Sequence, residues 1–235
     1  MDEKRGAQFR AGVRGGLPIV LGYIPIGIAY AIIARQAGLS VLETLLMSLL
    51  VYGGASQMMA AGMVAQGAAV PVIVLATFIL NLRHLIMSLC VQNRMQPAKT
   101  SWRLLAAYWV ADESFALFTT TERDKCTIWY FLGMASAAYV AWALSSLFGA
   151  LVTDLLPAIL SASLGVAIYA MFIALLLPHV RGNGRLALLV LLTALGNWVL
   201  GKFMAASWAL IVSTLLGAFA GLFFVELGEE GEQHA

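Results

Sequence analysis

Eight stretches of the chain are long and apolar enough to lie in lipid, yet several carry charged side chains near their middles. A helix needs about 20 apolar residues to cross the roughly 30 Å hydrocarbon core of a bilayer. Only helices do so with short connections, because lipid cannot satisfy exposed backbone groups. The sequence therefore predicts an all-α polytopic membrane protein with about seven or eight transmembrane segments. The predicted spans cover residues 17–35, 40–66, 70–92, 103–121, 127–152, 157–179, 185–201 and 204–225.

The composition excludes several other classes of protein. Apolar residues make up 61% of the chain and charged residues only 11%, against about 45–50% and about 25% in soluble domains. The formal net charge of +2 is too small to indicate nucleic-acid binding. Cys90 and Cys126 have neither a disulfide framework nor metal-ligand spacing, so we expect both to be buried core residues. We therefore expect no metal and no cofactor.

The sequence also lacks a phosphate-binding loop and a catalytic Ser/His/Asp constellation. A charge at the centre of a bilayer costs roughly 2.5–3.5 kcal/mol, so it survives where it faces a protein interior or a water-filled path. Polar groups within greasy spans thus indicate a protein that moves a solute across a membrane rather than an enzyme. Its energy must come from an ion gradient or from another chain.

We expect a single transmembrane permease domain, 1–235, built from two weakly repeated halves, 17–121 and 127–225. Thr77 and Asn81 recur 116 positions later as Thr193 and Asn197. Internally repeated halves are common in secondary transporters, whose substrate sites lie near the repeat interface.

The segment Tyr52-Gly53-Gly54-Ala55-Ser56-Gln57 interrupts an apolar run. Paired glycines weaken a helix by about 1 kcal/mol each relative to alanine, so we predict a broken helix there. A half-helix that starts near Ala55 would point free N–H groups at whatever lies in the break. A substrate carboxylate fits such a site, with side-chain hydrogen bonds from Ser56 and Gln57. Close packing of helices through small residues is the alternative.

Met58 follows this segment and could line an adaptable apolar pocket or simply pack in the core. Asn81, Arg83 and His84 lie near the middle of the span 70–92. Asn81 and His84 are three residues apart and share a helix face, whereas Arg83 needs a partner of its own. These polar groups serve transport and gating, or they form a structural hydrogen-bond network.

Asp112 and Glu113 lie at the centre of the predicted span 103–121. Adjacent carboxylates in a span repel one another and resist ionisation, a property that proton coupling requires. One of them could instead pair with Arg83 as a structural brace, and both roles can coexist.

The chain resembles the AzlC family, the large subunits of branched-chain amino acid exporters, over nearly its whole length. The resemblance is carried by short motifs in a fixed order: Leu17-Pro18, Tyr23-Ile24-Pro25, Gly38-Leu39-Ser40, Tyr52 to Gln57, Asn81-Leu82-Arg83-His84 and Asp112-Glu113-Ser114-Phe115.

The resemblance implies a bacterial inner-membrane, multi-pass exporter of valine, leucine and isoleucine, with methionine as a further candidate. It also implies a small AzlD-type membrane subunit as partner, while no coupling to a nucleotide-binding subunit is visible. Some relatives carry Asp where Asn81 stands, so a proton role at that position falls to Asp112 or Glu113 here.

We thus expect proton-driven export of branched-chain amino acids. Gly54, Ala55, Ser56, Gln57, Met58 and Asn81 would bind the substrate, and Arg83, His84, Asp112 and Glu113 would couple protons or gate. The rival interpretations are a non-transporting membrane scaffold or sensor and an intramembrane enzyme that uses Asp112, Glu113 and His84.

Overall fold

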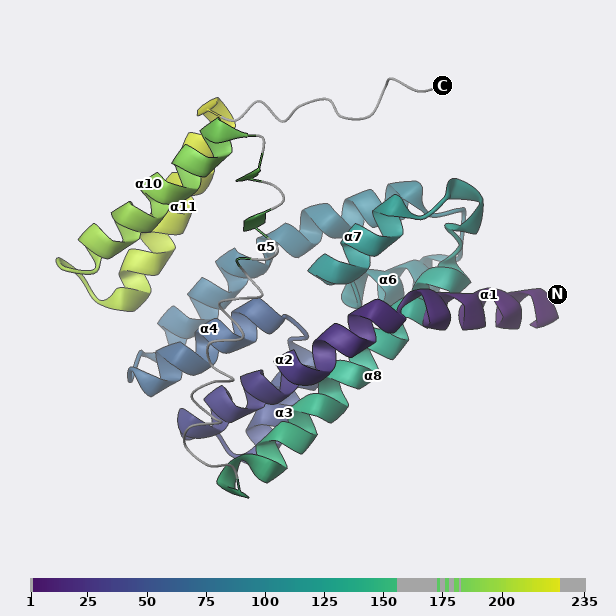
Figure 1. Cartoon of the computed structure of the whole chain (residues 1–235), viewed down its shortest axis with the longest axis horizontal. Helices are drawn as coiled ribbons and strands as arrows, with labels where there is room; N and C mark the ends of the chain where they lie inside the picture. Colours follow the sequence, from purple (N-terminus) through teal and green to yellow (C-terminus); the bar gives the residue numbers. More distant parts are fainter. Residues whose placement is uncertain (1, 156–172, 174–175, 178–179, 182, 225–235) are drawn as a thin grey trace. The chain divides into compact units, whose positions relative to one another are not determined.

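The computed structural model describes residues 2–155, 173, 176–177, 180–181 and 183–224, and within these residues it contains helices and no strands (Figure 1). The predicted all-α fold is therefore confirmed. The predicted span 157–179 lies almost entirely outside the described residues. The helices are α1 (Asp2–Gly15), α2 (Leu17–Gln36), α3 (Val41–Leu50), α4 (Gly54–Ala65), α5 (Val70–Arg94), α6 (Thr100–Tyr108), α7 (Asp112–Thr120), α8 (Ile128–Val152), α10 (Gly184–Leu200) and α11 (Ala206–Phe224), with short 3-10 turns at Arg123–Lys125 and Thr153–Leu155.

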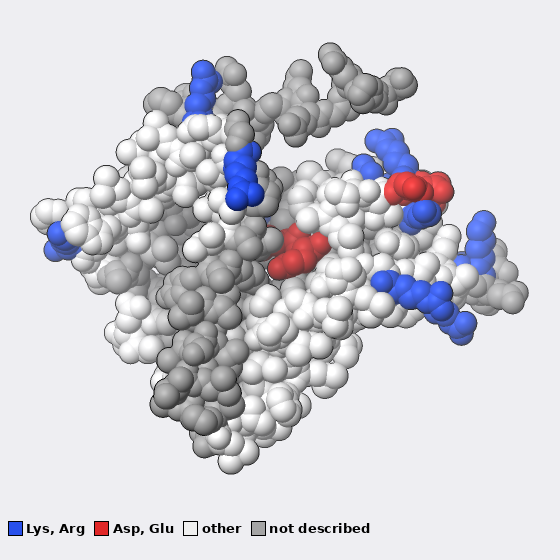
Figure 2. Space-filling model, in the orientation of Figure 1, with Lys and Arg blue, Asp and Glu red and all other residues white. Residues whose placement is uncertain are grey.

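Among the described residues, α2, α5 and α8 are each long and apolar enough to cross a membrane. The face of the molecule in Figure 2 is mostly uncharged, and its charged side chains form small, separate groups. The chain divides into two compact units, one of residues 1–69 and 73–168 and the other of residues 70–72 and 169–235. Every predicted site residue lies in the first unit.

The first unit is built around α8, which lies alongside both α1 and α2 (Figure 1). Glycines allow this close packing. A Cβ added at Gly133 would overlap the backbone carbonyl of Phe9, and one added at Gly149 would press on the backbone of Ile28. Small residues let helix backbones approach in this way in membrane bundles. Helix α1 has no counterpart among the predicted spans, because its sequence is too polar to cross lipid.

The predicted break near Gly53-Gly54 is confirmed: α3 ends at Leu50, and α4 begins at Gly54, one residue before the expected start. Ser40 begins α3 with a capping box, in which its side chain accepts from the Glu43 N–H while the Glu43 carboxylate accepts from the Ser40 N–H. Between the two half-helices Tyr52 adopts a positive φ of 45°. That residue turns the chain into α4.

The predicted span over 103–121 is not one uninterrupted helix. The segment forms two short helices, α6 and α7, separated by residues 109–111. Ala111 is extended, and its N–H and carbonyl bond the side chain of Ser114 at 2.9 and 3.0 Å. Asp112 and Glu113 occupy the first turn of α7, where the positive end of the helix dipole favours carboxylates. These local interactions start a new helix where hydropathy alone continues the old one.

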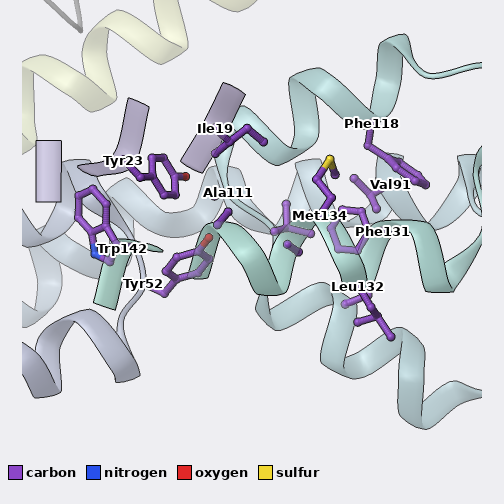
Figure 3. Close-up of a cluster of buried hydrophobic side chains, with 14 of the residues drawn as sticks. Ile19, Tyr23, Tyr52, Val91, Ala111, Phe118, Phe131, Leu132, Met134 and Trp142 are labelled. Atoms are coloured by element: carbon purple, nitrogen blue, oxygen red, sulfur yellow. The ribbon is translucent and has the colours of Figure 1, made fainter. Parts of the chain in front are cut away.

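A buried aromatic cluster connects these elements, with side chains from α2, the α3–α4 break and α8 (Figure 3). Trp142 packs edge-on against Tyr23, with ring centroids 5.2 Å apart, and stacks on Tyr30 at 5.9 Å. Cys126 is buried as expected, whereas Cys90 is exposed, so the burial prediction is wrong for Cys90. The cluster holds α2 and α8 against the break.

In the second unit, α10 and α11 pack as a helical pair. Asn183 caps α10 by accepting from the Leu186 N–H at 3.0 Å. Across the pair, Ser213 donates to the Asn197 Oδ1 at 3.3 Å, and Thr193 lies against Gly217. Thr193 and Asn197 thus serve helix packing here.

Candidate functional site

Gln57, whose side chain is fully buried, lies at the α3–α4 break and hydrogen-bonds the groups around it. Its Oε1 accepts from the Gly53 N–H at 3.2 Å and from the Trp142 indole N–H at 3.1 Å. Its Nε2 donates to the Ser48 hydroxyl at 3.2 Å. Three of the four hydrogen-bonding positions of the amide are therefore used within the protein. Gln57 ties α3, α4 and α8 together at the break.

Ser56 is also turned inward, because its hydroxyl donates to the Gly53 carbonyl at 2.9 Å. The first N–H groups of α4 are different. Within the described part of the chain, no acceptor contacts the backbone N–H of Gly54, Ala55 or Ser56. Such groups form the positive end of the helix and favour an anion. Met58 lies in the buried core, 8% exposed.

The C-terminal end of α3 is held by two tyrosines. The hydroxyl of Tyr108 donates to the Leu49 carbonyl at 2.5 Å and approaches the Leu50 carbonyl at 3.3 Å. The hydroxyl of Tyr139, on α8, donates to the same Leu49 carbonyl at 2.8 Å. Tyr108 is the last residue of α6. The two broken helices are therefore joined directly, end to end.

Glu113, in the first turn of α7, accepts a hydrogen bond of 2.6 Å from the Tyr23 hydroxyl. Tyr23 lies on α2 and is itself 6% exposed. Through its contact with Trp142, Tyr23 connects Glu113 to the Gln57 network. Two aromatic side chains, Trp142 and Tyr23, therefore link Gln57 to Glu113.

Asp112 forms an ion pair with Arg83, with 2.9 Å between Nη2 and Oδ2. Both side chains are about one-third exposed, at 36% and 34%. The pair joins the middle of α5 to the start of α7. The two neighbouring carboxylates are therefore in different situations, since Asp112 faces a cation and Glu113 faces a phenol.

The side chain of Asn81 lies beside the α3–α4 break, because a Cβ added at Gly53 would be 3.3 Å from its Oδ1. That oxygen is buried, and it has no hydrogen-bond partner among the described residues. His84 contacts the Asn81 backbone carbonyl through Nδ1 at 3.2 Å. Asn81 thus faces the break, while His84 makes its hydrogen bond within α5.

Sequence reasoning missed the aromatic residues that assemble the region, namely Tyr23, Tyr108, Tyr139 and Trp142. Aromatic side chains in apolar spans are ordinary core residues, and their spacing alone gives no sign of polar contacts. Their hydroxyl and indole N–H groups were the available signal, because buried Tyr and Trp usually find a hydrogen-bond partner. Within the described residues, no group of three or more His, Cys, Asp or Glu side chains could hold a metal ion.

Comparisons with known proteins place the chain in a family. The family model described as "AzlC protein" matches residues 18–156. An uncharacterized membrane protein of Archaeoglobus fulgidus is 32% identical over 76% of this chain and 79% of its own length. Inner membrane protein YgaZ of Escherichia coli is 29% identical over 93% of this chain and 92% of its own length.

A third relative carries a functional name. The branched-chain amino acid transport protein AzlC of Bacillus subtilis is 27% identical over 62% of this chain and 59% of its own length. No solved structure matches the chain. The family match covers more than half of the sequence and includes both helix breaks. The chain belongs to the AzlC family of membrane proteins.

Proposed function

We propose that this protein is a secondary-active exporter of the branched-chain amino acids valine, leucine and isoleucine, with methionine as a further candidate substrate. Transport would be driven by the proton gradient across the bacterial inner membrane, together with a small AzlD-type membrane subunit. The name of the Bacillus subtilis relative supports the substrate class, and that of the Escherichia coli relative supports the membrane. The proposal makes the chain a transporter rather than an enzyme.

The observation that carries the proposal is Glu113, a carboxylate bonded to Tyr23 and placed where two interrupted helices meet. A carboxylate in a span is a frequent proton carrier, and it also suits the ammonium group of an amino acid. The N–H groups of Gly54, Ala55 and Ser56, which have no acceptor among the described residues, suit the substrate carboxylate. Asn81 faces the same break with an amide oxygen that has no hydrogen-bond partner in the described part of the chain.

Asp112 and Glu113 have different roles in this proposal. Asp112 is held by Arg83, so we assign it to bracing α5 against α7. Glu113 has no cation beside it in any hydrogen bond or ion pair between described residues, so it takes the ammonium or the coupling proton. Gln57 supports the break through its internal hydrogen bonds, and Met58 supplies apolar surface.

Valine efflux from loaded cells tests this division. Glu113→Gln should abolish efflux driven by an imposed pH gradient, whereas Asp112→Asn should retain part of the rate. Wild-type rates in both variants would refute a role for these carboxylates. Reconstitution with and without the small subunit, followed by counterflow of labelled valine at imposed pH gradients, then separates transport itself from proton coupling.

The enzyme alternative would need Asp112, Glu113 and His84 to act on one scissile group. Each of these side chains has a different hydrogen-bond or ion-pair partner, namely Arg83, Tyr23 and the Asn81 carbonyl. That arrangement favours the transport proposal.

A further inference from the structure

Tyr52 combines a strained backbone with a buried hydroxyl that has no hydrogen-bond partner in the described part of the structure. Its φ of 45° is the only positive φ of a residue other than glycine within the described part of the chain. Such a conformation is costly for a bulky side chain and persists where the surroundings impose it, often at functional sites. Glycine in this position would adopt the turn without strain. A tyrosine at this position therefore indicates that its side chain has a role that glycine could not fill.

The hydroxyl of Tyr52 is the unusual part of this side chain. The residue is 4% exposed, and its ring packs edge-on against Tyr139 at 4.9 Å. Yet the hydroxyl has no hydrogen-bond partner among the described residues. Buried hydroxyls normally have one. The neighbouring hydroxyls of Tyr108 and Tyr139 follow that rule, because both donate to Leu49.

The direction of the Tyr52 hydroxyl indicates its function. In Figure 3 the hydroxyl ends of Tyr23 and Tyr52 both face the region beside Ala111, the residue before α7. The Tyr52 hydroxyl thus lies in the same region as the Tyr23 hydroxyl, which donates to the Glu113 carboxylate at 2.6 Å. A carboxylate oxygen and a phenol oxygen without a hydrogen-bond partner among the described residues are thus directed at one place. Both are acceptors, which an ammonium group with three N–H donors can satisfy.

We propose that the Tyr52 hydroxyl is the second ligand, beside the Glu113 carboxylate, of the substrate's primary ammonium group. This inference rests on the proposed function and adds a residue to its site. Tyr23 is a positioning residue that orients Glu113 through the 2.6 Å hydrogen bond. Tyr52 also lies directly before Gly53, so the residue that contacts the ammonium is joined by the backbone to the N–H groups assigned to the carboxylate. Ligands for the ammonium group favour amino acids over analogues that lack the amine.

Competition binding on the purified full-length protein tests this inference. Displacement of labelled L-valine is measured with unlabelled L-valine and with 2-hydroxyisovalerate, in which a hydroxyl replaces the ammonium. The wild-type protein should prefer valine, and Tyr52→Phe should reduce that preference about tenfold or more, since a hydrogen bond to a charged group is lost. Tyr139→Phe is the matched control and should keep the preference, because its hydroxyl serves Leu49.

Each outcome has a defined meaning. A wild-type preference in Tyr52→Phe, with valine still bound, overturns the inference and leaves the proposed function standing. No valine binding by the wild-type protein, with or without the small subunit, overturns the proposed function itself. Tyr52→Phe should also melt at the wild-type temperature, because the hydroxyl it removes has no hydrogen-bond partner among the described residues. A clearly lower melting temperature would reveal such a partner and would also overturn the inference.

Discussion

Replacing Gln57 by leucine separates a structural role for this residue from a ligand-binding one. Leucine is similar in size, but it leaves the Gly53 N–H and the Trp142 indole N–H without an acceptor. It also removes the donor to the Ser48 hydroxyl. Hydrogen bonds within membrane proteins average about 0.6 kcal/mol each, which gives about 2 kcal/mol for three. Two buried donors left without acceptors cost about 2–6 kcal/mol by the scale for protein interiors.

We therefore expect Gln57→Leu to lower the free energy of unfolding by at least about 2 kcal/mol. The assay is unfolding in mixed micelles of increasing SDS content, followed by circular dichroism. Gln66→Leu is the control, because Gln66 is an exposed residue directly after the end of α4. A loss smaller than about 1 kcal/mol would refute the reasoning. If valine binding disappeared in a variant of unchanged stability, Gln57 would be a ligand of the substrate and not a brace.

Two further predictions concern packing and charge. Arg83→Gln and Asp112→Asn should each lower the free energy of unfolding. The double variant should lose no more than the larger single loss, which corresponds to a coupling energy of about 0.5–1 kcal/mol for this partly exposed pair. Additive losses in the same SDS assay would show that the ion pair contributes nothing to stability. Gly133→Ala should destabilise by about 1–3 kcal/mol because its Cβ meets the backbone of Phe9. By contrast, Gly22→Ala, which has open space around it, should gain up to about 1 kcal/mol; equal melting temperatures for the two alanine variants would contradict the packing described for α1 and α8.

The two helix breaks differ in how far the sequence could predict them. The α3–α4 break was predicted because Gly53 and Gly54 carry a local backbone signal in an otherwise apolar run. The α6–α7 break was not, since residues 109–111 are Trp, Val and Ala, none of which interrupts a helix by itself. A local signal existed in Ser114, which bonds both backbone groups of Ala111. Hydropathy is blind to such side-chain caps, because it averages over the residues that form them.

The candidate site shows a similar division between local and distant information. The pairing of Arg83 with one of the acidic residues could be foreseen, because an intramembrane cation needs a counter-ion. Its assignment to Asp112 rather than Glu113 required the start of α7. The partner of Glu113 could not be foreseen, because Tyr23 is 90 residues away along the chain. Likewise, Trp142 is 85 residues from Gln57, and no periodicity relates residues so far apart.

The shared carbonyl of Leu49 has a mechanical consequence. It accepts hydrogen bonds from the hydroxyls of Tyr108, on α6, and Tyr139, on α8. Any rotation that withdraws the end of α3 must either rupture both bonds or drag the other two helices along. A movement at one helix break is thereby transmitted directly to the other, so the two breaks are mechanically coupled.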